Sequence, residues 1–217
     1  MKKMFAMKRF MKFSLVFALT SLLVYSYFAI NIGAFSLYVG TNKGGAQTGI
    51  QANIKPMTSY PDVTGSGESC WVSNVSGTGN NKQWVQTGIR YLDKPIYQDG
   101  YRTYLETKIS GVHNRTEISY CYLDDNYLYK VEYQLDNKWH AYIDGNEQGS
   151  YTLPFSSAAV QAQAEAHSST IDMGPFMFSN VKYKNSSNNW VYMDVTPTAD
   201  YPFSVNIINS HTYRAYR

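Results

Sequence analysis

Residues 160–167 read Val-Gln-Ala-Gln-Ala-Glu-Ala-His, so small apolar residues alternate with polar residues through the whole stretch. Successive side chains of a β-strand point to opposite faces, and this pattern therefore predicts one apolar face and one polar face. The apolar face suits the interior of a two-sheet protein. The polar face, with a carboxylate next to an imidazole, suits a wet groove. The alanine content of residues 158–166 also permits a short helix.

Other short alternating segments separated by turn residues lie on both sides of this stretch. The chain has 217 residues, of which 44% are hydrophobic and 16% aromatic, enough for one full-sized core. Aromatic and β-branched residues favour strands, and no segment shows a sustained helical period. We therefore predict an all-β fold, in which two antiparallel sheets pack in a single domain.

The predicted strands are bounded by turn residues, and Asp136-Asn137 and Asp144-Gly145 are the clearest hairpin signals. The candidate strands are Ile50–Ile54, Cys70–Val75, Gln83–Tyr91, Tyr101–Ile109, Glu117–Leu123, Tyr127–Leu135, Trp139–Ile143, Ala158–His167, Phe176–Tyr183, Trp190–Val195 and Val205–Tyr213.

The N-terminus resembles an export signal. Residues 1–34 contain five cations and no acidic residue, and an apolar run covers Phe13–Ile30. Cleavage after Ala34 gives a mature start at Phe35, while an uncleaved segment would anchor the chain in a membrane. Either way we expect an exported protein, with a Gly/Ser/Thr-rich segment at 35–67 and the remainder of the sandwich at 68–217.

The formal net charge is +3, but it comes from the leader. Without those five cations the rest of the chain carries about −2, so nucleic-acid binding loses its electrostatic basis. Cys70 and Cys121 are the only cysteines. In an oxidising compartment they would form a disulfide or remain as two buried thiols on separate strands.

The strand at Gln83–Tyr91 also divides into two faces. Four residues suit the core, namely Val85, Thr87, Ile89 and Tyr91. The opposite face presents Trp84, Gln86 and Arg90, with Gly88 leaving room between them. An antiparallel sheet commonly has one solvated face, so these residues are either ordinary surface positions or members of a groove.

Four segments carry a resemblance to a known family. They are Ser-Cys-Trp-Val at 69–72, Trp-Val-Gln-Thr-Gly-Ile at 84–89, Ala-Glu at 164–165, and the strand Phe176–Tyr183. In this order and spacing they resemble the glutamic peptidases, or eqolisins. The resemblance implies a concanavalin-like β-sandwich (jelly roll) and a secreted endopeptidase that works at acidic pH. It also implies that Gln86 and Glu165 are the catalytic pair.

In such a reaction Glu165 would act as general base on the attacking water, and Gln86 would orient the water and donate to the oxyanion. His167 departs from the family pattern. On a regular strand it lies on the same face as Glu165, where its protonated form would lower the pKa of that carboxyl. We assign substrate binding or tuning to Trp84, Arg90, Gln163 and His167.

Two other functions fit the same sequence. One is a carbohydrate- or surface-binding sandwich without catalysis, in which Trp84, Tyr101, Tyr104 and Trp190 would stack on sugars. The other is a structural protein of the cell exterior with a vestigial pair. The expected partner is accordingly a polypeptide substrate or an extracellular glycan, and we expect a monomer. No cofactor is expected, and Glu165 with His167 lacks the further ligands of a metal site.

Overall fold

The structure is a computed structural model that describes residues 36–57, 68–92, 100–167 and 173–217. The leader predicted at 1–34, with its cleavage site, lies outside these residues. None of the described residues forms a helix of the length and apolarity needed to cross a bilayer. Apart from the short 3-10 turn η1 (Gly79–Asn81), the regular secondary structure of the described chain is β.

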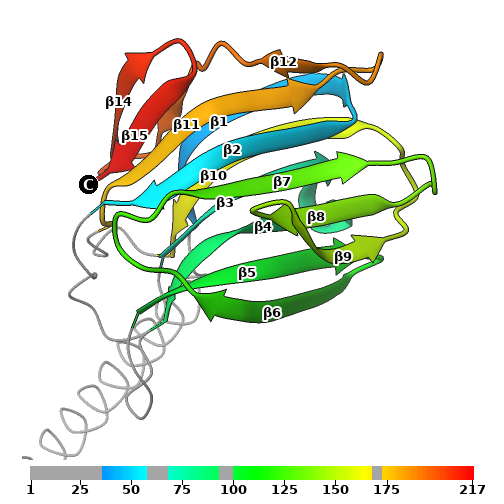
Figure 1. The fold of residues 1–217 in the computed structure, drawn as a ribbon, viewed down its shortest axis with the longest axis horizontal. Coiled ribbons are helices and arrows are strands. Elements are labelled where there is room, and N and C mark those ends of the chain that lie inside the picture. The colour runs from blue at the N-terminus through cyan, green and yellow to red at the C-terminus, as the bar shows by residue number, and fades with distance from the viewer. Residues whose placement is uncertain (1–35, 58–67, 93–99, 168–172) are drawn as a thin grey trace, which may run out of the picture. The chain divides into compact units, whose positions relative to one another are not determined.

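Two antiparallel sheets pack against each other (Figure 1). Sheet A has the order β13-β1-β10-β3-β4-β5-β6, with strands at Thr198–Ala199, Leu37–Gln47, Ala158–Ala166, Glu68–Ser76, Gln83–Leu92, Gly100–Ile109 and Val112–Tyr120. Sheet B has the order β14-β15-β11-β2-β7-β8-β9, with strands at Ser204–Asn209, Thr212–Tyr216, Phe176–Lys184, Gly49–Pro56, Tyr127–Tyr133, Trp139–Ile143 and Asn146–Tyr151. The short strand β12 (Trp190–Tyr192) pairs with β11. The predicted two-sheet β-sandwich is confirmed.

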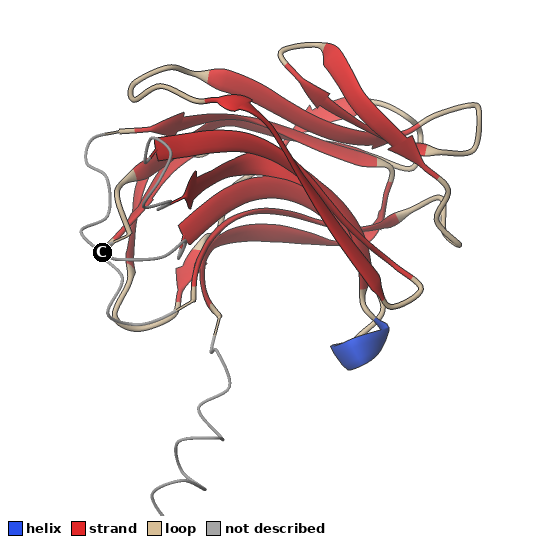
Figure 2. Cartoon of the chain, turned by 90° about the horizontal axis from the view of Figure 1, so that it is seen from below, coloured by secondary structure: helices blue, strands red, loops and turns tan. Residues whose placement is uncertain are grey.

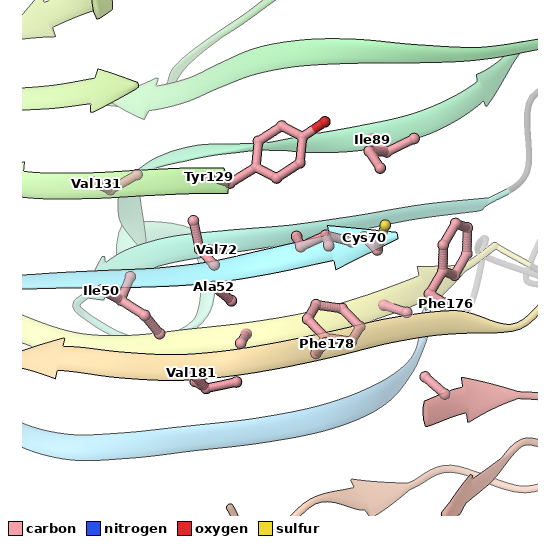
Figure 3. Close-up of a cluster of buried hydrophobic side chains, with 14 of the residues drawn as sticks. Ile50, Ala52, Cys70, Val72, Ile89, Tyr129, Val131, Phe176, Phe178 and Val181 are labelled. Atoms are coloured by element: carbon pink, nitrogen blue, oxygen red, sulfur yellow. The ribbon is translucent and has the colours of Figure 1, made fainter. Parts of the chain in front are cut away.

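The hydrophobic core fills the space between the two sheets. Val72 and Ile89 enter it from sheet A, and Ile50, Tyr129 and Phe178 enter it from sheet B (Figure 3). All five side chains are fully buried. Because each buried side chain of this size contributes about 1.5–3 kcal/mol, the strands are held in register by the apolar face that each one presents.

The stretch at residues 160–167 behaves as its alternation predicts. In β10 the even-numbered residues from 158 to 166 are buried, and the odd-numbered residues between them are partly exposed. The segment is therefore a strand and not the short helix that its alanines also permit. In β4 the four residues predicted to face the core are all buried. The two strands thus present their polar residues on the outer face of sheet A.

Strand β1 is the main element that the sequence patterns missed. Its residues include Gly40, Gly44 and Gly45, and glycine weakens a strand prediction because it has no side chain to pack. Here the glycine at position 40 serves the packing, since a Cβ at that position would lie 2.4 Å from the carbonyl oxygen of Ala162. The extended conformation of β1 therefore depends on its close pairing with β10 and not on the strand propensity of its own residues.

Turn residues determine where several of the remaining strands end and the next ones begin. The predicted turn at Asp144-Gly145 joins β8 to β9, with positive φ values of 48° and 80°. The predicted single strand at Val205–Tyr213 is wrong, because it is two strands, β14 and β15. Between them the side chain of Asn209 accepts a hydrogen bond from the backbone N–H of His211 at 2.9 Å, which turns the chain.

The two cysteines are free thiols, and both are buried. Cys70 lies on β3 and Cys121 follows β6, so β4 and β5 separate them within sheet A. Strands spaced about 4.8 Å apart hold the two Cα atoms beyond the roughly 7 Å that a disulfide can span. Of the two alternatives, two buried thiols on separate strands describe the structure.

We expect both thiols to react only after unfolding. Burial raises the pKa of the Cys70 thiol and raises the pKa of Cys121 to about 12. Little reactive thiolate therefore exists at neutral pH. Ellman's reagent at pH 7 should label far less than one thiol in the folded chain, and two after denaturation without reductant. No labelling of the denatured chain would instead indicate a disulfide.

Candidate functional site

A cleft opens on the outer face of sheet A. The strands of the sandwich are curved (Figure 2). The cleft has a volume of about 420 Å³, and strands β1, β3, β4, β5, β6 and β10 all contribute to its lining. Five of the predicted site residues line this cleft, namely Gln86, Glu165, Trp84, Gln163 and His167. Arg90 lines a smaller cavity beside it.

The strand register shows how the predicted catalytic pair is arranged. Glu165 on β10 pairs with Ser69 on β3, and Ser69 pairs with Arg90 on β4. Gln86 lies four residues before Arg90 on the same strand, which is about 13 Å along the strand direction. Gln86 and Glu165 therefore share a face and a cleft but lie diagonally across β3. The residue on β3 between their levels is Trp71.

The side-chain amide of Gln86 is held in one orientation. Its Nε2 atom donates to the hydroxyl of Tyr104 at 3.2 Å and to Oε1 of Glu106 at 3.2 Å. An ionised carboxylate can only accept hydrogen bonds, so the NH₂ group must face Glu106 and the carbonyl oxygen must face elsewhere. Both N–H groups of the amide are engaged, and Oε1 is the atom that remains to accept a hydrogen bond.

Glu106 is a site residue that sequence reasoning missed. This carboxylate is 3% exposed and also contacts Nε2 of His113 at 2.8 Å and Nε of Arg115. Alternation along β5 places Glu106 on the same face as Tyr104, a signal that the predicted strand already contained. The alternation pattern did not identify its partners His113 and Arg115, because both lie on the part of β6 that precedes the predicted strand.

The carboxylate of Glu165 has a different set of neighbours. Its side chain is 15% exposed, and Oε1 lies 3.6 Å from Nδ1 of His167. Tyr38 on β1 is its direct cross-strand partner. Burial, followed by the charge of Glu165, raises the pKa of the Tyr38 phenol, so the phenol stays protonated and can donate to the carboxylate. Tyr38 was missed because β1 was not predicted.

The four aromatic residues predicted as sugar platforms do not lie together on one surface. Tyr101 and Tyr104 are buried, at 2% and 1% exposure, and Trp190 lies on β12 of sheet B. Of the four proposed platforms, only Trp84 lines the cleft. Lys108 lies 5.2 Å from the centre of the Trp84 ring. Among the described residues, no group of three or more His, Cys, Asp or Glu could hold a metal ion.

Comparisons with known proteins bear on the fold. No protein-family model and no curated protein sequence matches the chain. Scytalido-glutamic peptidase, solved with a peptide-based transition-state analog, aligns with a TM-score of 0.58 at 13% identity. SCP-B, a member of the eqolisin family of peptidases in complex with the tripeptide Ala-Ile-His, aligns with a TM-score of 0.53 at 13% identity. Each alignment covers 83% of this chain and 98% of the other chain.

A Bacillus licheniformis β-glucanase is more distant, with a TM-score of 0.41 at 12% identity over 81% of this chain and 68% of its own. The TM-scores of the two peptidase structures establish a shared fold, and identities this low establish nothing about chemistry. The structural neighbours of this chain thus include eqolisin peptidases, and the sandwich that the resemblance implied is confirmed.

We expect the Glu106→Gln substitution to destabilise the fold by about 1–3 kcal/mol, because Arg115 and His113, which are partly exposed, lose the carboxylate that accepts from them. Glu147→Gln on sheet B is the matched control, since its side chain is 44% exposed and its ion pair with His140 should contribute less than about 1 kcal/mol. Urea unfolding at neutral pH measures both variants. Equal midpoints for the two variants would contradict the structural role of Glu106.

Proposed function

We propose that this chain is a glutamic-type endopeptidase, in which Glu165 activates a water for attack on a peptide carbonyl. The observation that carries the proposal is that a partly exposed carboxylate and an oriented amide lie in one cleft of this sandwich. Two structural neighbours are peptidases solved with a peptide-based analog and with a tripeptide bound, which supports a polypeptide substrate for this chain. We further propose that the predicted leader exports the chain.

The chemistry assigned to Glu165 follows from its surroundings. As a general base it must accept a proton from the water, and Nδ1 of His167 lies 3.6 Å from Oε1 of the carboxyl. The phenol of Tyr38 is a further donor on the β1 side. A carboxylate oriented from two sides is suited to receive a proton from a water that enters from the open cleft.

Gln86 has a narrower role than the sequence predicts. Its two N–H groups are committed to Tyr104 and Glu106, so Gln86 acts through Oε1, which accepts a hydrogen bond from the bound substrate. Because Glu106 is itself held by two cationic side chains, the amide cannot rotate without losing a buried hydrogen bond. The amide is therefore a fixed acceptor before substrate binds.

We expect Glu165→Gln to lower the rate of cleavage by about 10²–10⁴-fold, the range for loss of general-base catalysis. Gln86→Ala should lower it by only about 10-fold, because it removes one hydrogen bond to the bound substrate. The measurement is the hydrolysis of an acid-denatured protein by the purified chain at acidic pH, followed by the release of new amino termini. Glu147→Gln, which makes the same change on sheet B, should leave the rate unchanged. Equal activity in all four proteins would eliminate the proposal.

A further inference from the structure

A second, much smaller cavity adjoins the cleft and has no role in the reaction as described so far. Its volume is about 10 Å³, which is room for roughly one oxygen atom. It shares Arg115 and His167 with the lining of the cleft. It is lined by Glu68, Ser69, Arg90, Tyr104, Arg115 and His167. We call it the side cavity.

Arg90 is the residue of the side cavity that lies level with Glu165. The pairing runs from Glu165 through Ser69 to Arg90, so the two charged side chains stand on the strands that flank β3. Adjacent strands lie about 4.8 Å apart, which places the two backbones roughly 10 Å from each other. The short side chain of Ser69 leaves the space between them open to a group of a bound substrate.

The ion pair that Arg90 forms with a carboxylate is a weak one. Its side chain is 12% exposed, and its carboxylate partner Glu117 is 3.8 Å away, beyond hydrogen-bond distance. Burial, followed by the nearby charge of Arg115, lowers the pKa of Arg90. The guanidinium nevertheless stays charged at any working pH. A negative charge placed beside Arg90 would offset both the burial of the guanidinium and its repulsion by Arg115.

The other groups around the side cavity leave room for such a charge. Arg115 directs Nε to Glu106. The carboxylate of Glu68 accepts hydrogen bonds from the hydroxyl of Tyr101 at 2.5 Å and from the backbone N–H of Gly174 at 3.1 Å, so both of its oxygens are engaged. His167 adds a second positive charge when it is protonated.

We propose that Arg90 stabilises the oxyanion of peptide hydrolysis in the side cavity. This inference rests on the proposed function and deepens it. Since both N–H groups of Gln86 are engaged, the reaction needs another donor at the developing negative charge, and Arg90 is the charged donor opposite the base.

The step balances without a further reactant. As the water oxygen bonds to the carbonyl carbon, Glu165 takes a proton from the water and the carbonyl electron pair moves to the oxygen beside Arg90. Collapse of this intermediate restores the C=O bond and breaks the C–N bond. The leaving nitrogen receives the proton from Glu165, so the products are a carboxylic acid and an amine.

Arg90→Gln tests the role through kinetics. We expect kcat to fall by about 10²–10³-fold with KM changed by less than about threefold, because the interaction exists only in the transition state. Arg90→Lys keeps the charge without the planar fork and should retain part of the rate. This variant also serves as the test if Arg90→Gln does not fold. Arg102→Gln is the matched control, since that guanidinium stacks on Tyr120 and does not line the side cavity.

A second measurement does not depend on turnover. Formate is titrated into the protein labelled with ¹⁵N-arginine, and the Nε resonance of Arg90 should shift saturably, whereas that of Arg102 should not. No saturable shift, or an unchanged kcat in Arg90→Gln, overturns the inference about Arg90 and leaves the peptidase proposal standing. A saturable shift in a chain that cleaves no protein keeps the anion site and removes the peptidase proposal.

Discussion

The pairing of β3 with β10 on one side and with β4 on the other is the constraint on which the site depends. The core determines this register, because Cys70 and Val72 of β3 must face sheet B. A slip by one residue would bring those side chains to the outer face of sheet A and turn Ser69 and Trp71 toward the core. The same register sets Glu165 level with Arg90. The hydrophobic interior therefore determines which polar groups meet outside it.

Alternation alone predicts much of this arrangement. It assigns the apolar face of β10 to the core and Glu165 to the opposite face, and it does the same for Gln86 on β4. These are local properties, since the side-chain period of a strand is two wherever the strand lies. Hairpin turns such as Asp144-Gly145 are equally local. The fold class and the face of each predicted site residue could therefore be inferred from short segments.

Alignment between distant strands could not be inferred in this way. Glu165 and Arg90 are level only because each pairs with Ser69, and no local pattern encodes that match. Glu106 belongs to the site through partners on β6, and Tyr38 through its pairing with β10. The contact of Tyr38 joins residues far apart in the sequence, so its prediction requires the strand order. The contacts of Glu106 lie within the β5–β6 hairpin, and their prediction requires the register of that hairpin and its irregularity.

Charge is distributed unevenly across the outer face of sheet A. Glu165 lies on the β10 side of the cleft, whereas Arg90 and Arg115 lie on the β4 and β6 side. Glu106 neutralises Arg115, which leaves Arg90 as the partly buried cation with the weakest pairing of the two. A partly buried guanidinium with a weak ion pair lowers the stability of the fold. A transient negative charge in the side cavity would offset this loss by pairing with Arg90.

A crystal structure of the chain with an oligopeptide that carries a phosphinate in place of the scissile amide tests this account most directly, because the phosphinate mimics the tetrahedral intermediate. The account predicts one phosphinate oxygen within hydrogen-bond distance of the Arg90 guanidinium and the other beside the carboxylate of Glu165. An analog bound with Arg90 still facing only Glu117, or bound away from the cleft, would contradict it.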